Sequence, residues 1–198
     1  MMRLINIISA CIIILVAVSG CGHSPVPRPR GYFRIDMPEK TYVNLYDQKN
    51  IPAMPFSFEY PTYGSLTFGS GAPEEEGWFN IEFPGYKAII YLTYKPVKND
   101  FGAIMEQTYR MNVKNHITKA DAINEQAFSN DSEKVFGILY DLKGNTASAV
   151  QFYVTDSTKH YLRGSLYFNA QPDADSLAPV ISFFREDIVH LIETLRWY

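Results

Sequence analysis

The chain has 198 residues, of which 46% are hydrophobic and 20% are charged, so it can bury one sizeable core and does not have the composition of a disordered protein. Eighteen Lys and Arg side chains against 21 Asp and Glu give a net charge of −3, which excludes general nucleic-acid binding. Aromatic residues make up 15% of the chain, and because they favour half-buried strands, we expect a sheet-rich domain.

Residues 1–20 are predicted to be an export signal. Arg3 provides a positive charge at the start, and an apolar stretch from Leu4 to Val18 follows it. As a helix, this stretch reaches only about 22 Å, which is too short for a hydrocarbon core of about 30 Å. The stretch therefore predicts a cleavable signal rather than a membrane-spanning helix.

The run Val18-Ser19-Gly20-Cys21 is similar to a bacterial lipobox. This similarity implies cleavage between Gly20 and Cys21, a thioether-linked lipid on Cys21, and acylation of the new N-terminus by a chain such as palmitate. Because one acyl chain anchors a protein only reversibly, several chains would be needed to hold it permanently to a membrane leaflet. The other cysteine, Cys11, lies in the signal, so no intrachain disulfide is expected. The alternative, an ordinary cysteine after a signal peptide, stays open.

Residues 21–31 are predicted to form a tether between the lipid and the domain. Three prolines at alternate positions restrict their own backbone and that of the preceding residues to extended geometry. The alternative is a proline-rich ligand for a partner protein, with Arg28 and Arg30 as contacts. After the tether, we expect a single globular α+β domain over residues 32–198.

The first part of this domain reads as a series of strands, because short aromatic or β-branched runs alternate with proline and glycine. Pro84-Gly85 is a turn dipeptide of the right length for a hairpin between the last two runs. The expected strands are Tyr32–Ile35, Tyr42–Tyr46, Phe56–Tyr60, Tyr63–Phe68, Trp78–Phe83 and Tyr86–Tyr94.

A helix is expected next, beginning after Asn99 or Asp100 and ending near Lys119. A three-strand meander then follows, and its middle strand has apolar residues on both faces, which predicts a sheet covered on both sides. The strands of this meander are Lys134–Leu142, Thr146–Asp156 and Lys159–Asn169.

The last element is predicted to be an amphipathic helix that is capped by Asp175 or Ser176 and continues up to Trp197. The order along the chain is strands, helix, strands, helix. This order favours an α+β fold in which helices flank an antiparallel sheet, rather than repeated βαβ units.

Motifs for common enzyme chemistry are not found: the chain has no phosphate loop, no dinucleotide-binding glycine motif, no nucleophile elbow and no zinc-binding cysteine pair. We therefore expect no enzyme and no cofactor. Arg163 and Tyr161 alternate with Leu162 and Leu166, so a polar concavity that takes a small ligand stays open as an alternative.

One helix face could bind a metal ion. Glu186, His190 and Glu193 fall within a narrow arc of the last helix, on the side away from its apolar residues. An ordinary solvated face is the expectation, and a metal site is the alternative. Glu74-Glu75-Glu76 is likewise interpreted as a solvated loop, with a partner dock or cation site as its alternative.

Several segments together resemble the GldD family of gliding-motility-associated lipoproteins, and they cover nearly the whole mature chain. The stalk-to-strand run is the most distinctive of them. The segments are the lipobox at Cys21, Pro29–Ile35 with Pro38-Glu39, Trp78–Ile81 with Phe83-Pro84, Ile90–Tyr94, His116 with Lys119–Ile123, Phe184–Ile188 and Leu195–Trp197.

This resemblance implies a lipid-anchored envelope component that gliding requires and that is linked to type IX secretion. It implies other envelope proteins as partners, with a membrane contact through the lipid and no known small-molecule substrate, and a domain that faces the periplasm from the inner or the outer membrane. The resemblance provides no catalytic residues. The element order also resembles the PsbP and Mog1 type of α/β/α sandwich, which implies a fold and no function.

Overall fold

The structure of the chain, a computed structural model, describes residues 31, 34–49, 51–68, 77–170 and 173–198. The chain divides into two units, Met1–Arg34 and Ile35–Tyr198, and the helices and strands of the described residues belong to the second unit. The predicted signal 1–20, the lipid site Cys21 and the loop carboxylates Glu74-Glu75-Glu76 lie outside the described residues. They stay predictions.

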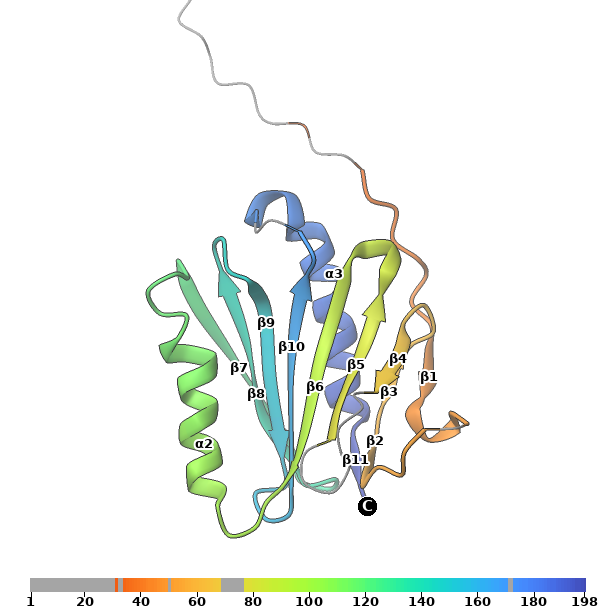
Figure 1. Cartoon of the computed structure of the whole chain (residues 1–198), viewed down its shortest axis with the longest axis vertical. Helices are drawn as coiled ribbons and strands as arrows, with labels where there is room; N and C mark the ends of the chain where they lie inside the picture. The colour runs from red at the N-terminus through yellow and green to blue at the C-terminus, as the bar shows by residue number, and fades with distance from the viewer. Residues whose placement is uncertain (1–30, 32–33, 50, 69–76, 171–172) are drawn as a thin grey trace, which may run out of the picture. The chain divides into compact units, whose positions relative to one another are not determined.

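A seven-stranded antiparallel sheet forms the centre of the second unit (Figure 1). Its strand order is β4-β5-β6-β10-β9-β8-β7. The strands are β4 (Ser65–Phe68), β5 (Gly77–Phe83), β6 (Ala88–Pro96), β7 (Ala122–Asn130), β8 (Val135–Lys143), β9 (Ser148–Thr155) and β10 (His160–Phe168). The short strands outside it are β1 (Tyr42–Asn44), β2 (Phe56–Ser57), β3 (Glu59–Pro61) and β11 (Arg196–Trp197). The helical elements are η1 (Leu45–Asp47), η2 (Pro84–Tyr86), α2 (Phe101–Tyr109), the π-helical η3 (Arg110–Lys114) and α3 (Ala174–Thr194).

β5 and β6 form the predicted hairpin. The 3-10 turn η2 lies at the predicted Pro84-Gly85 position, with proline at the start of the turn, where its missing N–H costs no hydrogen bond. Lys87 then takes a left-handed backbone conformation with φ 50°. Because this residue completes the turn, β6 begins at Ala88 rather than at Tyr86.

An edge strand, β7, was not expected from the sequence. It pairs with β8 along its nine residues, yet none of its side chains is fully buried. A polar edge strand gains little from burial, so its sequence has no alternation of hydrophobic and polar residues from which the strand could be predicted. The three predicted meander strands are confirmed to within two residues at each end, and the meander has this fourth member.

Two short ladders lie outside the main sheet: β1 pairs with β3, and β2 pairs with β11. They show that the expectation of one strand over Phe56–Tyr60 is wrong. Phe58 interrupts the strand, and its carbonyl accepts a hydrogen bond from the N–H of Leu45 at 2.8 Å. The last two residues of the expected strand Tyr32–Ile35 are irregular and exposed, so side-chain packing does not hold them in a sheet.

α2 and η3 carry the chain across one face of the sheet, from β6 in the middle to β7 at the far edge. Val113 of η3 packs in a small hydrophobic cluster with Tyr140 and Leu142 of β8. The helix follows Asp100 as predicted, but its regular part ends with η3 and is followed by turns up to Lys119. This path leaves β5 and β6 beside the helical segment rather than beneath it (Figure 1).

α3 covers the other face of the sheet. Its N-cap is Asp173 rather than the predicted Asp175 or Ser176, because Asp173 has an extended backbone and its side chain accepts a hydrogen bond from the N–H of Ser176. The helix also ends earlier than the predicted Trp197. Leu195 returns to extended geometry, which lets β11 pair with β2.

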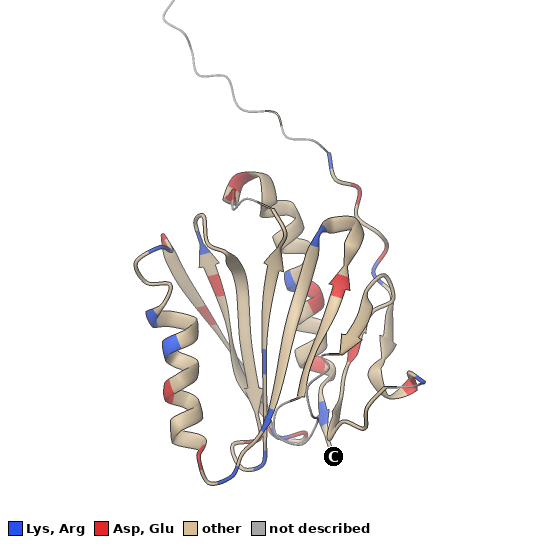
Figure 2. Ribbon diagram, in the orientation of Figure 1, with Lys and Arg blue, Asp and Glu red and all other residues tan. Residues whose placement is uncertain are grey.

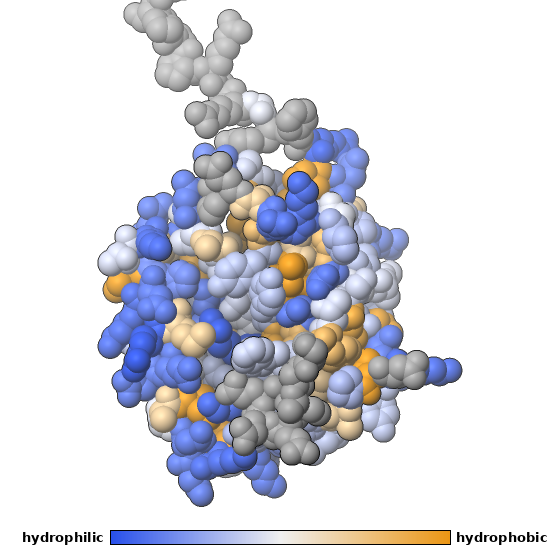
Figure 3. Space-filling view, in the orientation of Figure 1, coloured by the Kyte–Doolittle hydropathy of each residue, from blue (hydrophilic) through white to orange (hydrophobic). Residues whose placement is uncertain are grey.

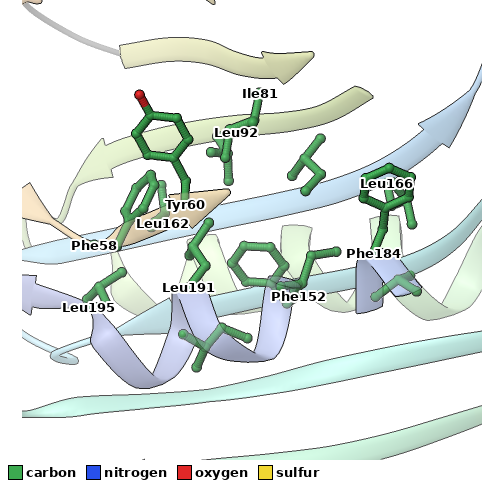
Figure 4. Packing of buried hydrophobic residues seen from close by; sticks show 14 of the residues in the cluster. Phe58, Tyr60, Ile81, Leu92, Phe152, Leu162, Leu166, Phe184, Leu191 and Leu195 are labelled. Atoms are coloured by element: carbon green, nitrogen blue, oxygen red, sulfur yellow. The ribbon is translucent and has the colours of Figure 1, made fainter. Parts of the chain in front are cut away.

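The main hydrophobic core lies between α3 and the sheet. Phe184 and Leu191 of α3, and Leu195 directly after it, point towards Phe152 and Leu162 of the sheet (Figure 4), and all five are buried. The central strands carry few charged residues, which lie mainly on the helices and near the ends of strands (Figure 2). An antiparallel sheet flanked by helices is therefore observed, and the predicted α+β class is confirmed.

Candidate functional site

A cleft opens on the α2 side of the sheet, with a volume of about 200 Å³. Side chains alternate between the two faces of a strand, so Tyr161 and Arg163 lie on this side while Leu162 lies in the core on the other. These are the residues whose alternation in the sequence suggested a polar concavity. The cleft is lined by Trp78, Thr93, Lys95, Ile104, Gln107, Thr108, Met111, Tyr161 and Arg163.

Arg163 is held in the cleft by two amide side chains. Its Nε donates to Oδ1 of Asn112 at 3.2 Å, and its Nη2 donates to Oε1 of Gln151 at 3.1 Å. Burial lowers the pKa of Arg163, which reflects the cost of removing this charge from water. Within the described part of the chain, its guanidinium forms no ion pair with a carboxylate. Other arginines that do form such pairs are Arg110, Arg185 and Arg196.

Gln151 is held in turn by His116, with 2.9 Å between their Nε2 atoms. Burial, together with the positive charges of Arg163 and Lys119, lowers the pKa of His116. The neutral imidazole accepts a hydrogen bond from the Gln151 amide N–H, which leaves the Gln151 oxygen facing Arg163. A chain of hydrogen bonds thus orients the guanidinium.

Two polar groups near Arg163 are buried and have no hydrogen-bond partner among the residues that the structure describes. They are Nδ2 of Asn112 and Oγ of Ser165, in residues that are 0% and 3% exposed. Buried polar groups in native proteins are nearly always satisfied, so each such group calls for an explanation. The surroundings of Arg163 therefore combine an unbalanced charge with unused hydrogen-bonding capacity.

Aromatic side chains lie beside this cleft, on the part of the face that α2 leaves uncovered. Trp78 of β5 is 63% exposed and Tyr91 of β6 is 45% exposed. Tyr91 packs edge-to-face against Tyr167 of β10, with ring centroids 5.5 Å apart. We call Trp78, Tyr91 and Tyr167 the aromatic face. In Figure 3, hydrophilic residues gather on the side where α2 lies, and residues of intermediate hydropathy, drawn in pale colours, occupy the middle of the view.

A second charged cluster, centred on Asp187, lies on the α3 side of the sheet. The carboxylate of Asp187 is completely buried and accepts hydrogen bonds from Lys40 Nζ at 2.7 Å, from the Tyr42 hydroxyl at 2.9 Å and from the Tyr63 hydroxyl at 2.6 Å. Burial and the hydrogen bond to Asp187 raise the pKa of both tyrosines. This cluster attaches the segment that leads into β1 to the middle of α3.

The expectation of a wholly solvated face on α3 is wrong for His190. Its ring stacks on Tyr42 with centroids 3.7 Å apart, and its Nε2 lies 2.7 Å from Oε2 of Glu59, because β1 and β3 pack against this face. Nζ of Lys40 lies 3.4 Å from Oε2 of Glu186, and Glu193 is exposed. Among the described residues, no three His, Cys, Asp or Glu side chains lie close enough together to hold a metal ion.

Several members of these clusters were not predicted from the sequence, among them Asn112, Gln151 and Asp187. Gln151 carried a usable signal, since a single amide in an apolar strand predicts a buried polar contact. Asn112 and Asp187 carried none, because polar residues on amphipathic helices are usually solvated. Only the packing of β1 and β10 against them shows that they are buried.

In the described part of the chain, no helix combines the length and apolar character that a membrane crossing needs. The predicted attachment at Gly20 and Cys21 lies outside that part and stays a prediction.

Comparison with known proteins gives one family match. Residues 22–197 match the family model described as gliding motility lipoprotein GldD. No curated protein matches the chain significantly. The chain is similar to the solution structure of cyanobacterial PsbP (CyanoP) from Synechocystis sp. PCC 6803, with a TM-score of 0.45 and 13% identity over 88% of this chain and 100% of that one.

Proposed function

Because the chain belongs to the GldD family of gliding motility lipoproteins, we propose that it is an anchored envelope protein that binds and stabilises other proteins of the gliding machinery and of the type IX secretion apparatus. In this proposal, cleavage before Cys21 and lipidation of its thiol attach the chain to a membrane. Residues 21–31 then act as the tether, and the domain over residues 32–198 faces the periplasm.

The aromatic face is the observation that carries the protein-binding proposal. Tyrosine and tryptophan are enriched in protein interfaces, because they bury a large apolar surface and still offer a polar atom. Trp78 and Tyr91 stay exposed on strands that are rigidly paired on both sides, β5 between β4 and β6 and β6 between β5 and β10. Such a surface needs little reordering on binding, which favours affinity.

We expect binding without catalysis. The described residues that line the cleft include no cysteine, serine, histidine or carboxylate that could serve as a nucleophile or general base. The hydroxyl of Thr108 donates to the carbonyl of Ile104 and lies 2.6 Å from the Tyr161 hydroxyl. These contacts support a structural role for Thr108.

Crosslinking in intact envelopes tests the binding proposal. The anchored chain is crosslinked and purified, and its partners are identified by mass spectrometry, for the wild type, Tyr91→Ala and the control Tyr46→Ala. Tyr46 is 76% exposed and lies outside the aromatic face, so it matches Tyr91 in chemistry. We expect Tyr91→Ala to lose gliding and secretion proteins that the wild type and Tyr46→Ala capture. Equal capture by all three would contradict the proposal.

Membrane fractionation tests the anchor. We expect Cys21→Ser to move the protein from the membrane to the soluble fraction and to stop gliding, because its attachment depends on the lipid. Mass spectrometry of the wild-type N-terminus should show an acylated cysteine. An unacylated N-terminus, or normal fractionation and motility of Cys21→Ser, would show that the lipobox assignment is wrong.

A further inference from the structure

The guanidinium of Arg163 has hydrogen-bonding capacity that the described residues do not use. An arginine side chain has five N–H donors in a planar fork. Nε and Nη2 each donate to one amide oxygen, while Nη1 has no hydrogen-bond partner among the described residues. A charged group removed from water is stabilised by an opposite charge, and the described residues supply none here.

The fork is also held in a fixed orientation. Asn112 and Gln151, both completely buried, bind two of its nitrogens, and His116 fixes the amide of Gln151. These contacts come from three elements: η3, β9 and the turns that follow η3. Pre-orientation of this kind lowers the entropy that a ligand loses on binding.

The other side chains that line the cleft indicate which chemical groups a ligand would carry beside its charged group. Trp78, Ile104 and Met111 provide an apolar wall. Lys95 also lines the cleft, but it has an interaction of its own, whereas the guanidinium of Arg163 has only two neutral amides as hydrogen-bond partners among the described residues. The volume of about 200 Å³ is below the range of roughly 300–1,000 Å³ that is usual for sites of drug-sized ligands.

We propose that this cleft binds a small organic acid, with its carboxylate on Arg163 and its apolar body against Trp78, Ile104 and Met111. A planar guanidinium matches a planar carboxylate through two parallel hydrogen bonds. One positive charge balances one carboxylate, whereas a phosphate dianion would need more donors. This binding shares Trp78 with the aromatic face, but it depends on the charge of Arg163, whereas the proposed docking of proteins is tested at Tyr91.

The test uses the purified full-length lipoprotein in detergent micelles, titrated with phenylacetate and with its neutral analogue phenylacetamide. Binding is measured by calorimetry and by saturation-transfer NMR of the ligand. We expect saturable binding of phenylacetate, and binding of phenylacetamide that is at least about tenfold weaker, because the amide has no charge for Arg163. Inorganic phosphate and an N-acetylated peptide with a free C-terminal phenylalanine serve as the competing anions.

Two variants assign the binding to Arg163. Arg163→Met removes the charge, and Asn112→Asp supplies a carboxylate from inside the protein while leaving every residue that lines the cleft in place. We expect each to weaken phenylacetate binding by at least about tenfold. The control Arg110→Met removes an exposed arginine that is paired with Glu106, and it should leave the affinity within about twofold of the wild type.

The proposal is wrong if the wild type shows no saturable phenylacetate binding, or if phenylacetamide binds equally well. Unchanged affinity in a folded Asn112→Asp variant would also overturn it. Tighter binding of phosphate, or of the peptide, than of phenylacetate would assign the cleft to a different ligand. The capture of partners is measured with Tyr91→Ala, a residue that does not line the cleft, so the failure of one proposal is distinguishable from the failure of the other.

Discussion

The sheet separates two buried charged clusters that differ in how fully their groups are satisfied. On the α3 side, the carboxylate of Asp187 accepts hydrogen bonds from one lysine and two tyrosines. On the α2 side, Arg163 has two neutral amide partners and no carboxylate among the described residues, and polar groups near it have no partner. A cluster whose charged and polar groups are all hydrogen-bonded stabilises the fold. A cluster beside a cleft whose groups are only partly hydrogen-bonded can still bond to a ligand.

The same difference appears in what each cluster connects. Asp187 joins α3 to a segment nearly 150 positions away, since it lies 147 residues from Lys40 and 145 from Tyr42. Arg163 of β10 binds Asn112 of η3 and Gln151 of β9, and η3 and β9 already pack together in the hydrophobic cluster around Val113. The Asp187 cluster should therefore contribute more to stability, and four predictions test this difference.

The largest effect is expected for Asp187→Asn. The substitution removes a completely buried charge and leaves Lys40 without its closest carboxylate partner, so we expect the free energy of unfolding in urea to fall by about 3 kcal/mol. The control is Glu186→Gln, since Glu186 also lies near Lys40 but is exposed, and it should change stability by less than about 1 kcal/mol. Equal losses would show that the cluster is only a surface ion pair.

Tyr63→Phe should have the second-largest effect. It removes the 2.6 Å hydrogen bond to Asp187 and keeps the ring that packs against Phe83 and Phe183. Because the acceptor is charged and buried, we expect a loss of about 2 kcal/mol in the same urea experiment. Tyr86→Phe is the matched control, since its exposed hydroxyl donates to a backbone carbonyl of Asp36, and the loss there should be clearly smaller.

Arg163→Met is expected to cost no more than about 1 kcal/mol, because the loss of two hydrogen bonds is offset by the removal of an unbalanced buried charge. The informative control is Arg185→Met, which leaves the carboxylate of Asp141 without the guanidinium that lies 2.8 Å from it, and it should cost more. If Arg163→Met instead destabilises the protein as much as Asp187→Asn does, the two clusters do not differ in how fully their charges are satisfied.

The smallest effect concerns the pH dependence of stability. Burial lowers the pKa of His116, aided by the charges of Arg163 and Lys119, so the unfolded chain binds the proton more readily than the folded chain. The stabilising contribution is therefore present above about pH 6.5 and is lost as the pH falls through the lower folded pKa. We expect stability to decline over this range, and His116→Gln to reduce the slope of the decline.

The contribution of a second histidine to the pH dependence of stability must be measured separately in that experiment. Burial also lowers the pKa of His160, although Asp156 opposes this shift, so both histidines add to the slope. His160→Gln measures its share, and the double variant should have the smallest slope. If His116→Gln leaves the slope unchanged, then His116 is not held in the neutral form by its surroundings.

Much of the fold was predictable from local patterns. Paired strands such as β5 and β6 were recognised because burial on one or both faces imposes a hydrophobic pattern on their residues. β7 was not recognised, because an edge strand is held mainly by backbone hydrogen bonds, which place little demand on its side chains. The break at Phe58 was also missed, since it depends on a hydrogen bond from the distant Leu45.

The amino-acid sequence alone was enough to predict the class of the fold, the resemblance to the family and the alternation that places Arg163 on the polar side of β10. The folded structure was needed to show that Arg163 lies in a cleft with no carboxylate among its described lining residues, while Asp187 lies among three donors. Alternation and periodicity are properties of neighbouring residues, so a sequence reports them directly. Whether a charge is satisfied depends on side chains that reach it from remote parts of the chain, and folding alone brings those together.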